Sequence, residues 1–380
     1  MIKKVFPILA ISMFTSILGI GIIVPFLSLY ATEMEATGIW LGMIFTGYGL
    51  ASSIVSPIAG RLSDRRGRKQ FLAIGLLTYS IVSVSFIWIV NPYQLALARL
   101  IQGAAGGMVF PIAMACIGDI SPEGEEGKWM GYSTAAFFSG FGFGPLMGGV
   151  LTEHFGMDVA FASMAGLNML AFLLITFFFP EIKQRKTSTD TSLSFREMST
   201  SGIIRGIFSL RFTQAMGRGS FMVFLPIFAG IILGLKTTFI GALISVHVFS
   251  MCLLSPIAGH IADRYDRRAL VVLSSFMYLI PMALIPLARN FWLLFLVCAL
   301  QGIGSSISMT ASQALIVEEG RKFGMGSTMS LPMLAMGLGM VVGPLASGGL
   351  YDFFVSTDPA FYFAAGVGLL GAGLFVWFTR

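Results

Sequence analysis

Two short segments of the chain carry aspartate and arginine side chains in nearly the same order. Residues 56–69 read SPIAGRLSDRRGRK and residues 255–268 read SPIAGHIADRYDRR, so eight of the fourteen positions are identical at an offset of 199. An arginine near two carboxylates can form ion pairs with both, and pairs near water are weak enough to be made and broken. The residues that could take part are Asp64, Arg68 and Asp119 in the first copy and Asp263, Arg267 and Glu318 in the second.

Four further ionisable side chains, Arg99, Arg211, Arg218 and His247, lie inside long apolar runs. If these runs cross a membrane, such groups are costly and mark a functional site by default. We expect Arg218 to line a cavity of positive potential; Arg211, seven residues earlier, shares its helix face. Two interpretations stay open for each of the others. Arg99 anchors the first helix through its carbonyls or lines the cavity, and Arg211 reaches the membrane surface or lines the cavity. His247 is a hydrogen-bonded core residue or a proton carrier.

Acidic residues are missing from the same depth. The chain has 18 Asp and Glu residues, and none falls near the middle of an apolar run. An embedded enzyme needs converging Asp, Glu or His side chains, and a charge-selective channel needs a ring of charge. The three cysteines lack a C-x-x-C spacing, and the chain has no Walker loop for ATP. We therefore expect no enzyme activity, no metal and no cofactor.

The overall composition is that of a membrane protein. Hydrophobic residues make up 56% of the 380 and charged residues 11%, with a mean hydropathy of +0.85. A soluble domain carries about 25% charged residues. The apolar runs are continuous rather than alternating, which favours spanning helices over a β-barrel. We predict twelve helices, at roughly 5–31, 38–60, 70–90, 93–118, 128–152, 158–180, 206–233, 237–259, 269–288, 291–316, 325–352 and 359–379.

The basic residues also predict an orientation. Of the 24, three lie deep within the predicted helices, Lys236 and Arg289 lie in loops on one side, and the other 19 lie in loops or at helix ends on the opposite side. Basic loops stay in the cytoplasm. We expect a multi-pass protein of a bacterial or archaeal plasma membrane, in contact with lipid and with both termini cytoplasmic. The basic residues form no continuous face for nucleic acid.

The chain divides into two similar halves. A polar stretch at 181–205 separates six predicted helices in residues 1–180 from six in residues 206–380. The offset of 199 holds across three pairs of helices and also carries Glu153 onto Asp352. Two similar six-helix bundles around a site at the membrane midplane are the architecture of a secondary transporter. We therefore predict an all-α integral membrane fold of two pseudo-symmetric bundles with a cytoplasmic linker.

The first charged segment resembles the signature loop of the major facilitator superfamily. The resemblance rests on Gly60-x-Leu62-x-Asp64-Arg65-x-Gly67-Arg68-Lys69, and Arg99-x-x-Gln102-Gly103 resembles a second motif of that family. It implies the major facilitator fold over essentially the whole chain. It also implies that the charged clusters form a cytoplasmic gate, closed when the cavity faces outward.

Physical arguments explain why these residue types could form such a gate. Gly60 would let two helices pass closely. Asp64 could face the N-terminus of the helix at 325–352, near Gly326, where free N–H groups favour a carboxylate. The second copy has Asp266 in place of Gly67, so we do not expect the same tight turn there.

A glycine-rich stretch of the predicted fifth helix resembles a motif of the proton-coupled drug antiporters in the same superfamily. Its residues are Gly131, Gly140, Gly144, Pro145, Gly148 and Gly149. The resemblance implies export, with this helix bent and sealed against the helix at 325–352. The alternative is a kinked packing surface, because glycine and proline are common in spanning helices.

These features together predict a monomeric secondary active transporter that takes a small-molecule substrate. We expect it to export amphipathic or drug-like molecules in exchange for protons by rocking of its two halves. Many antiporters of that kind keep a carboxylate within the first or fourth helix, whereas the first helix here offers only Ser12, Thr15 and Ser16. The alternative is a transporter of an organic anion or a lipid, with a positive cavity and no simple proton coupling.

Overall fold

The computed structural model describes residues 2–122, 125–181, 200–323 and 325–379; the side chains of 3–4, 126–127, 321–323 and 325–327 fall outside the description. In these ranges, 12 helices are long and apolar enough to cross a membrane, judged by length and composition. Each coincides with one of the predicted segments, and no strand occurs in the described ranges. The all-α membrane fold is therefore confirmed. Most of the predicted linker, residues 182–199, lies outside the described residues.

Contacts between residues divide the chain into two units. Unit 1 comprises Met1–Ala36, Met43–Lys186 and Leu235–Ser245, and unit 2 comprises Thr37–Gly42, Thr187–Gly234 and Val246–Arg380. This division departs from the two halves of the sequence at the starts of two helices, α3 (Gly38–Arg66) and α10 (Thr237–Arg264). The chain therefore crosses from one unit to the other inside α3, after Gly42, and inside α10, after Ser245.

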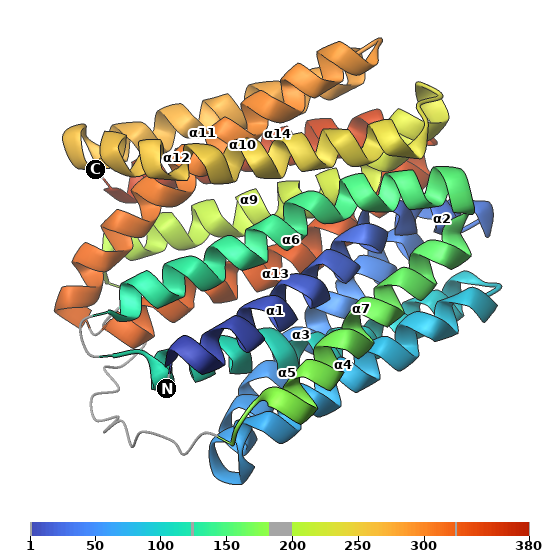
Figure 1. Cartoon of the computed structure of the whole chain (residues 1–380). Coiled ribbons are helices and arrows are strands. Elements are labelled where there is room, and N and C mark those ends of the chain that lie inside the picture. Colours follow the sequence, from blue (N-terminus) through green and yellow to red (C-terminus); the bar gives the residue numbers. More distant parts are fainter. Residues whose placement is uncertain (1, 123–124, 182–199, 324, 380) are drawn as a thin grey trace. The chain divides into compact units, whose positions relative to one another are not determined.

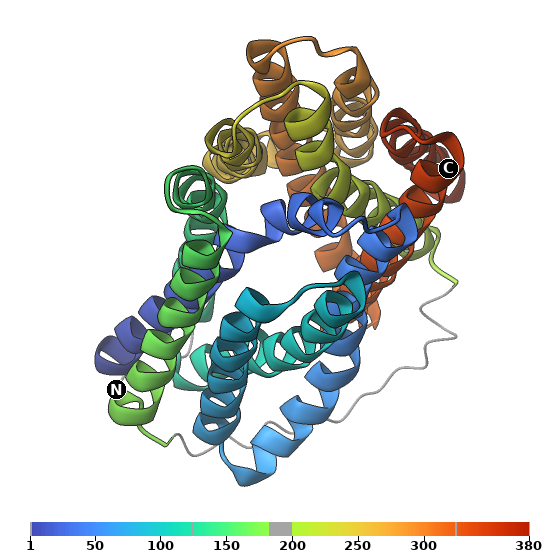
Figure 2. The ribbon, with the colours of Figure 1, turned by 90° about the vertical axis from the view of Figure 1, so that its right-hand side faces the viewer.

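Unit 1 is built on α1, which packs against α6 and α7, and on α4, which packs against α5 and α7 (Figure 1, Figure 2). A short 3-10 turn at Val24–Phe26 holds Pro25 and separates α1 from α2, since proline cannot donate a helical hydrogen bond. The helices are α1 (Ile2–Ile23), α2 (Leu27–Glu33), α4 (Arg68–Ser85), α5 (Pro92–Ile120), α6 (Glu126–Phe155) and α7 (Met157–Phe178).

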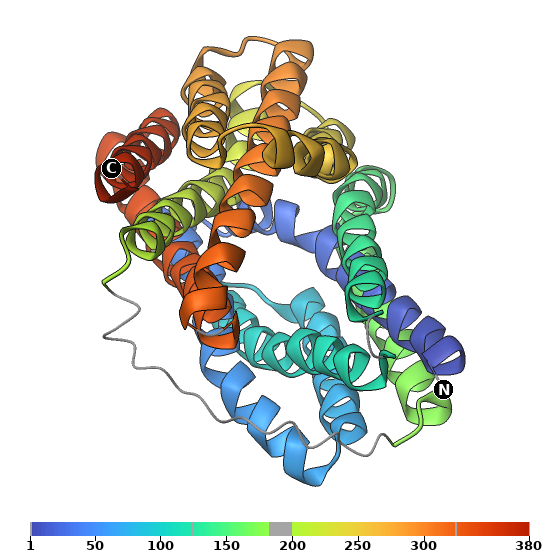
Figure 3. The same ribbon diagram turned by 90° about the vertical axis from the view of Figure 1, so that its left-hand side faces the viewer.

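Unit 2 repeats this packing with helices shifted by the offset of the sequence repeat. Here α9 packs against α13 and α14, and α11 packs against α12 and α14 (Figure 3). The 3-10 turns at Phe86–Trp88 and Ile285–Leu287 also stand 199 residues apart. The helices are α9 (Gly202–Ile227, continued by a π-helical turn at Phe228–Ile232), α11 (Arg267–Leu284), α12 (Phe291–Phe323), α13 (Met325–Phe354) and α14 (Asp358–Thr379). The two units are therefore copies in packing as well as in sequence.

Each unit has its own apolar core. In unit 1 this core includes Leu72, Ile112 and Cys116, and in unit 2 it includes Leu210 and Val271. Large apolar side chains also cover the outside of the helices; the most exposed include Trp88, Leu253, Trp292 and Met333. Apolar residues on both faces of a helix are expected where lipid is the solvent.

Candidate functional site

The first charged cluster joins the ends of three helices in unit 1. Arg68 Nη2 lies 2.8 Å from Asp119 Oδ2 at the end of α5 and 3.5 Å from Asp64 Oδ1 near the end of α3. The Arg68 side chain is 8% exposed, that of Asp119 16% and that of Asp64 46%. Arg68 therefore forms its tighter ion pair with Asp119 in a largely buried place, and the Asp64 carboxylate remains accessible to a further partner.

The local turn explains how Arg68 reaches this position. Gly67 separates α3 from α4 with φ +98°, a left-handed conformation that glycine adopts without strain. A Cβ atom at Gly67 would also collide with the carboxylate of Glu181. The backbone conformation accounts for glycine at this point of the loop, whereas the Glu181 carboxylate ends a flexible side chain that can shift.

The second charged cluster has the same pattern in unit 2 but lies closer to the surface. Arg267 forms an ion pair with Glu318 of α12, and its Nη2 lies 3.8 Å from Asp263 Oδ1. The exposed fractions are 29% for Arg267 and 51% for Glu318. The turn also differs, as the sequence indicated. Asp266 has φ −58° and caps α11 by accepting hydrogen bonds from the N–H groups of Arg268 and Ala269.

Two expected gate contacts stay predictions. No described atom lies within 4 Å of the position that a Cβ would take on Gly60, so a side chain has room there in this structure. Gly326, the expected partner of Asp64, lies in the stretch 321–327, whose side chains fall outside the description.

The glycines of α6 form a seam against α1. A Cβ on Gly140 would lie 2.8 Å from the Phe14 carbonyl oxygen, and a Cβ on Gly148 would lie 2.7 Å from the Ile22 carbonyl carbon. Gly144, beside Pro145, meets the Gly21 backbone in the same way, and Gly149 meets the start of α10. The close neighbours of these glycines are therefore α1 and α10, and the expected seal against the helix at 325–352 stays a prediction. Gly131 has no described atom within 4 Å of a Cβ position.

Arg99 is buried in unit 1 and anchored from α3. Its Nη1 donates to Oε1 of Gln102 at 2.6 Å, and its guanidinium lies 4.4 Å from the centre of the Tyr48 ring. This stacking is a cation–π contact. Tyr48 comes this close because Gly103 of α5 has no side chain: a Cβ there would lie 2.7 Å from the Tyr48 Cα. Tyr79 of α4 also interacts with the Arg99 guanidinium. These partners of Arg99 lie in α3, α4 and α5, and the predicted anchor to carbonyls of α1 is not among them.

A polar stripe on α9 faces α12 in unit 2. Arg211 Nη2 donates to the Ser312 hydroxyl at 2.6 Å and to the Met309 carbonyl at 3.0 Å, and Gln214 Nε2 donates to the Ser308 hydroxyl at 2.8 Å. Arg211 is buried. It therefore does not reach the membrane surface, and its role in this structure is to hold two helices together.

Arg218 continues this stripe two turns further along α9 but differs from Arg211. It is half-buried and makes no hydrogen bond or ion pair with any described residue. It lies close enough to His247 and Tyr278 to affect them electrostatically. His247 is buried, and its Nδ1 has no hydrogen-bond partner among the described residues. Arg218 and His247 are thus polar groups of unit 2 with unused hydrogen-bonding capacity.

Sequence reasoning missed several buried polar contacts. Asn168 of α7 accepts a hydrogen bond from the Ser16 hydroxyl of α1 at 2.7 Å, and Ser80 of α4 donates to the Ala165 carbonyl at 2.9 Å. Asn168 is an uncharged residue inside an apolar run, and only this polarity could have marked it. Neither contact involves a group that titrates near neutral pH, so both are structural.

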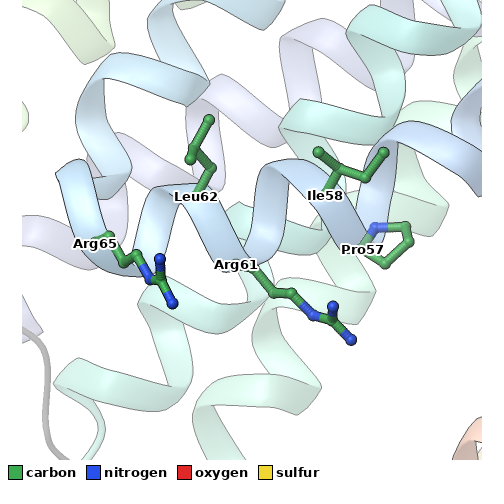
Figure 4. Close-up of a pocket in the computed structure, with 5 residues that line it drawn as sticks. All are labelled: Pro57, Ile58, Arg61, Leu62 and Arg65. Carbon is green, nitrogen blue, oxygen red and sulfur yellow. The ribbon is translucent and has the colours of Figure 1, made fainter.

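The surface also holds an open depression on α3. It is lined by Pro57, Ile58, Arg61, Leu62 and Arg65, and the guanidinium groups of Arg61 and Arg65 extend to the same side of the helix (Figure 4). All five residues come from one helix and are exposed. A substrate site needs convergent groups from several elements, so this depression is not a candidate for one.

Comparison with known proteins gives a consistent result. A sequence model described as the Major Facilitator Superfamily matches residues 9–236 and 207–380. An uncharacterized MFS-type transporter of Methanocaldococcus jannaschii is 28% identical over 362 residues, which cover 92% of each chain. The quinolone resistance protein NorA of Staphylococcus aureus is 27% identical over 395 residues, covering 97% of this chain and 95% of that protein. The crystal structure of the nucleoside transporter NupG superposes with a TM-score of 0.78 at 16% identity, covering 99% of both chains.

Proposed function

Because the chain belongs to the major facilitator superfamily, we propose that it is a secondary active transporter that exports small amphipathic or drug-like molecules in exchange for protons. The observation that carries this proposal is the duplication of helix packing in two units, each with an ion cluster at the same end of its helices. Two similar bodies of this kind can alternate access to a central site by rocking against each other.

The ion clusters have a clear physical part in this cycle. Each holds the ends of three helices together within its own unit, so these ends move as one body. In unit 1 the pairing of Arg68 with Asp119 leaves the half-exposed Asp64 carboxylate to engage the opposing unit when the basic side closes. We propose that the residues of this gate are Gly60, Asp64, Arg68, Asp119, Asp263, Arg267 and Glu318.

The direction of transport rests on two observations. The α6 motif packs backbone against backbone on α1, which makes a rigid wall that resists leak. A relative that matches 97% of this chain is named for resistance to quinolones, and removal of a drug from the cell is one way to resist it. The charge asymmetry supports an orientation with both termini in the cytoplasm, and we propose this orientation for a monomer in the plasma membrane.

Proton coupling would use the titratable groups that remain. His247 lies within a described spanning helix, and its Nδ1 has no hydrogen-bond partner among the described residues. Asp64 and Asp119 lie at the proposed gate. A histidine can change charge near neutral pH. We propose these three residues as candidates for the proton carrier.

A second candidate function is favoured by Arg218. A cation half-buried in a spanning helix without a counter-ion creates a positive potential. An organic anion or an anionic lipid would supply the missing charge, and bonds to a charged group are stronger than neutral ones. In this second proposal the cavity binds an anionic solute, and transport does not require simple coupling to protons.

One flux experiment distinguishes the two functions. The purified protein is placed in liposomes with an imposed pH gradient, and transport is measured for a cationic, a neutral and an anionic amphipathic solute. The first proposal expects flux that follows the gradient. Gradient-independent flux that favours the anion, with a KM raised about tenfold in Arg218→Ala, would instead support the second.

The matched control is Arg289→Ala, which removes a basic side chain from an exposed loop and should leave the flux unchanged. Transport that favours the cation and survives Arg218→Ala would contradict the hypothesis of anion transport. Flux without any dependence on the pH gradient would overturn the hypothesis of proton-coupled export.

A further inference from the structure

Two carboxylates lie at the helix ends opposite the charged clusters, and the sequence repeat relates them. Glu153 lies near the end of α6 and Asp352 near the end of α13, 199 residues apart. Neither belongs to the gate or the cavity described above. Each contacts the beginning of another helix.

Glu153 binds the first turn of α10. Its Oε2 accepts a hydrogen bond from the Thr238 N–H at 3.2 Å, and its Oε1 lies 3.1 Å from Lys236 Nζ. The Thr237 hydroxyl donates to the Gly149 carbonyl at 3.0 Å. The first N–H groups of a helix have no partner within the helix and carry partial positive charge, so a carboxylate stabilises this end.

Asp352 binds the first turn of α3 in the same manner. Its Oδ1 accepts from the Gly38 N–H, and its Oδ2 accepts from the Ile39 N–H at 2.9 Å. Ile39 precedes Thr238 by 199 residues, so the two carboxylates bind equivalent amides. Both contacts are therefore copies of one structural feature.

Glycines bring the helix backbones together at both places. A Cβ on Gly42 of α3 would lie 2.6 Å from the Pro344 carbonyl oxygen of α13. Its equivalent in α10, Gly241, would meet the Pro145 carbonyl oxygen of α6 in the same way. Such contacts leave no room for a side chain, so each carboxylate lies beside a tight backbone joint.

The capped helices are the ones in which the chain passes between the units. Residues 37–42 belong to unit 2 and the rest of α3 to unit 1, whereas residues 235–245 belong to unit 1 and the rest of α10 to unit 2. Each carboxylate thus fixes the start of a helix whose remainder belongs to the other unit.

We propose that Glu153 and Asp352 are paired latch residues, which hold the extracellular side closed by capping α10 and α3 and release both helix starts when that side opens. This inference rests on the alternating access and the orientation proposed above. The carboxylates and the amides that they cap lie at helix ends, so both are hydrated when the contact is released, and the net cost of breaking each hydrogen bond is small. A contact that is broken in every transport cycle must have a small net cost of this kind.

The test measures distances between spin labels across each joint in the full-length protein in nanodiscs. Cys116, Cys252 and Cys298 are first replaced by Ala, and one label pair is then placed at Phe155 and Ile232. A second pair, at Glu33 and Phe354, is related to the first by the offset of 199 and reports on the other joint. All four of these positions are exposed.

The double variant Glu153→Gln, Asp352→Asn keeps the shape of both side chains and removes their charge. We expect it to change the ratio of long to short distances by about tenfold in favour of the long ones, because a neutral acceptor caps a helix more weakly. The controls change polar groups outside the joints: His154→Gln at the end of α6 and Asp358→Asn at the start of α14. Both should leave the ratio unchanged.

An unchanged ratio in a folded double variant would overturn the latch. If the double variant does not fold, Gly241→Ala tests the same joint, because its Cβ should wedge α10 away from α6 and lengthen the distance at the first pair. The distances require neither substrate nor protons. A shift in distance without transport of any solute would therefore contradict the proposed function and still support the latch. Gradient-driven flux without a shift in distance would contradict the latch alone.

Discussion

Arg68 and Arg267 occupy equivalent positions in the two charged clusters but lie in different surroundings. Arg68 is largely buried against Asp119, while Arg267 and its partner Glu318 are substantially exposed. Water screens an exposed pair and offers an alternative partner to each charge, whereas a buried arginine depends on its carboxylate. The two clusters therefore share a pattern but should differ in how much they stabilise their units.

This difference predicts unequal effects of two matched substitutions. Asp119→Asn should lower the stability of the protein by about 3 kcal/mol, because it leaves a buried guanidinium without its main counter-charge. Glu318→Gln should cost less than about 1 kcal/mol. Thermal unfolding of both variants in the same detergent provides the comparison. Equal shifts in Tm would contradict the assignment of a buried and an exposed cluster.

Among the helices, α6 shows most clearly how a sequence motif serves packing. Its glycines resemble an antiporter motif in their spacing, but in this structure they serve the packing of α6 on α1. The equivalent Gly339 and Gly343 of α13 approach the Phe212 and Met216 backbone of α9 in the same way. The motif is thus one copy of a seam that both units use. Its role in export is a separate proposal.

The seam predicts a division among the glycines of the motif. Gly148→Ala should cost about 1–3 kcal/mol, because its Cβ would collide with the Ile22 backbone and force the helices apart. Gly131→Ala and Gly60→Ala place a Cβ in open space and should leave Tm unchanged or slightly raised. Loss of stability in Gly131→Ala to the same extent as in Gly148→Ala would refute the seam. Loss of transport in Gly60→Ala without loss of stability would place its close contact in the other state of the cycle.

At the scale of the whole molecule, charge and helix direction together define two sides. The basic segments lie at the ends of α3 and α10 and the starts of α4 and α11, whereas Glu153 and Asp352 lie at the opposite helix ends. Since basic loops are retained in the cytoplasm, the latch carboxylates should face outward.

This orientation predicts which single cysteines an impermeant reagent can reach. In a background without native cysteines, Trp88→Cys should react with a charged maleimide in intact cells, and Tyr265→Cys should react only after the cells are opened. Both positions are well exposed. The reverse pattern would show that the termini lie outside.

Much of the fold could be predicted from the apolar runs and the charges of the sequence. Twelve long apolar runs must become helices, because a chain in lipid has to satisfy its own backbone hydrogen bonds. The resemblance of the Asp64 segment to the superfamily's signature loop is confirmed by the match of the family model over nearly the whole chain. Such signals are local or repeated along the chain, so one sequence suffices to read them.

The partners of individual side chains needed the tertiary structure. Arg211 could have reached the membrane surface, and only its position beside α12 makes Ser312 its partner. Glu153 and Asp352 had a known offset in sequence, yet their role as caps became visible only where α6 meets α10 and α13 meets α3. The sequence alone determined the spans, the duplication and the asymmetry of charge, because hydrophobicity and repetition are properties of the chain itself. Tertiary structure decided which helix each glycine, arginine and carboxylate meets, because such contacts depend on packing between segments far apart in the chain.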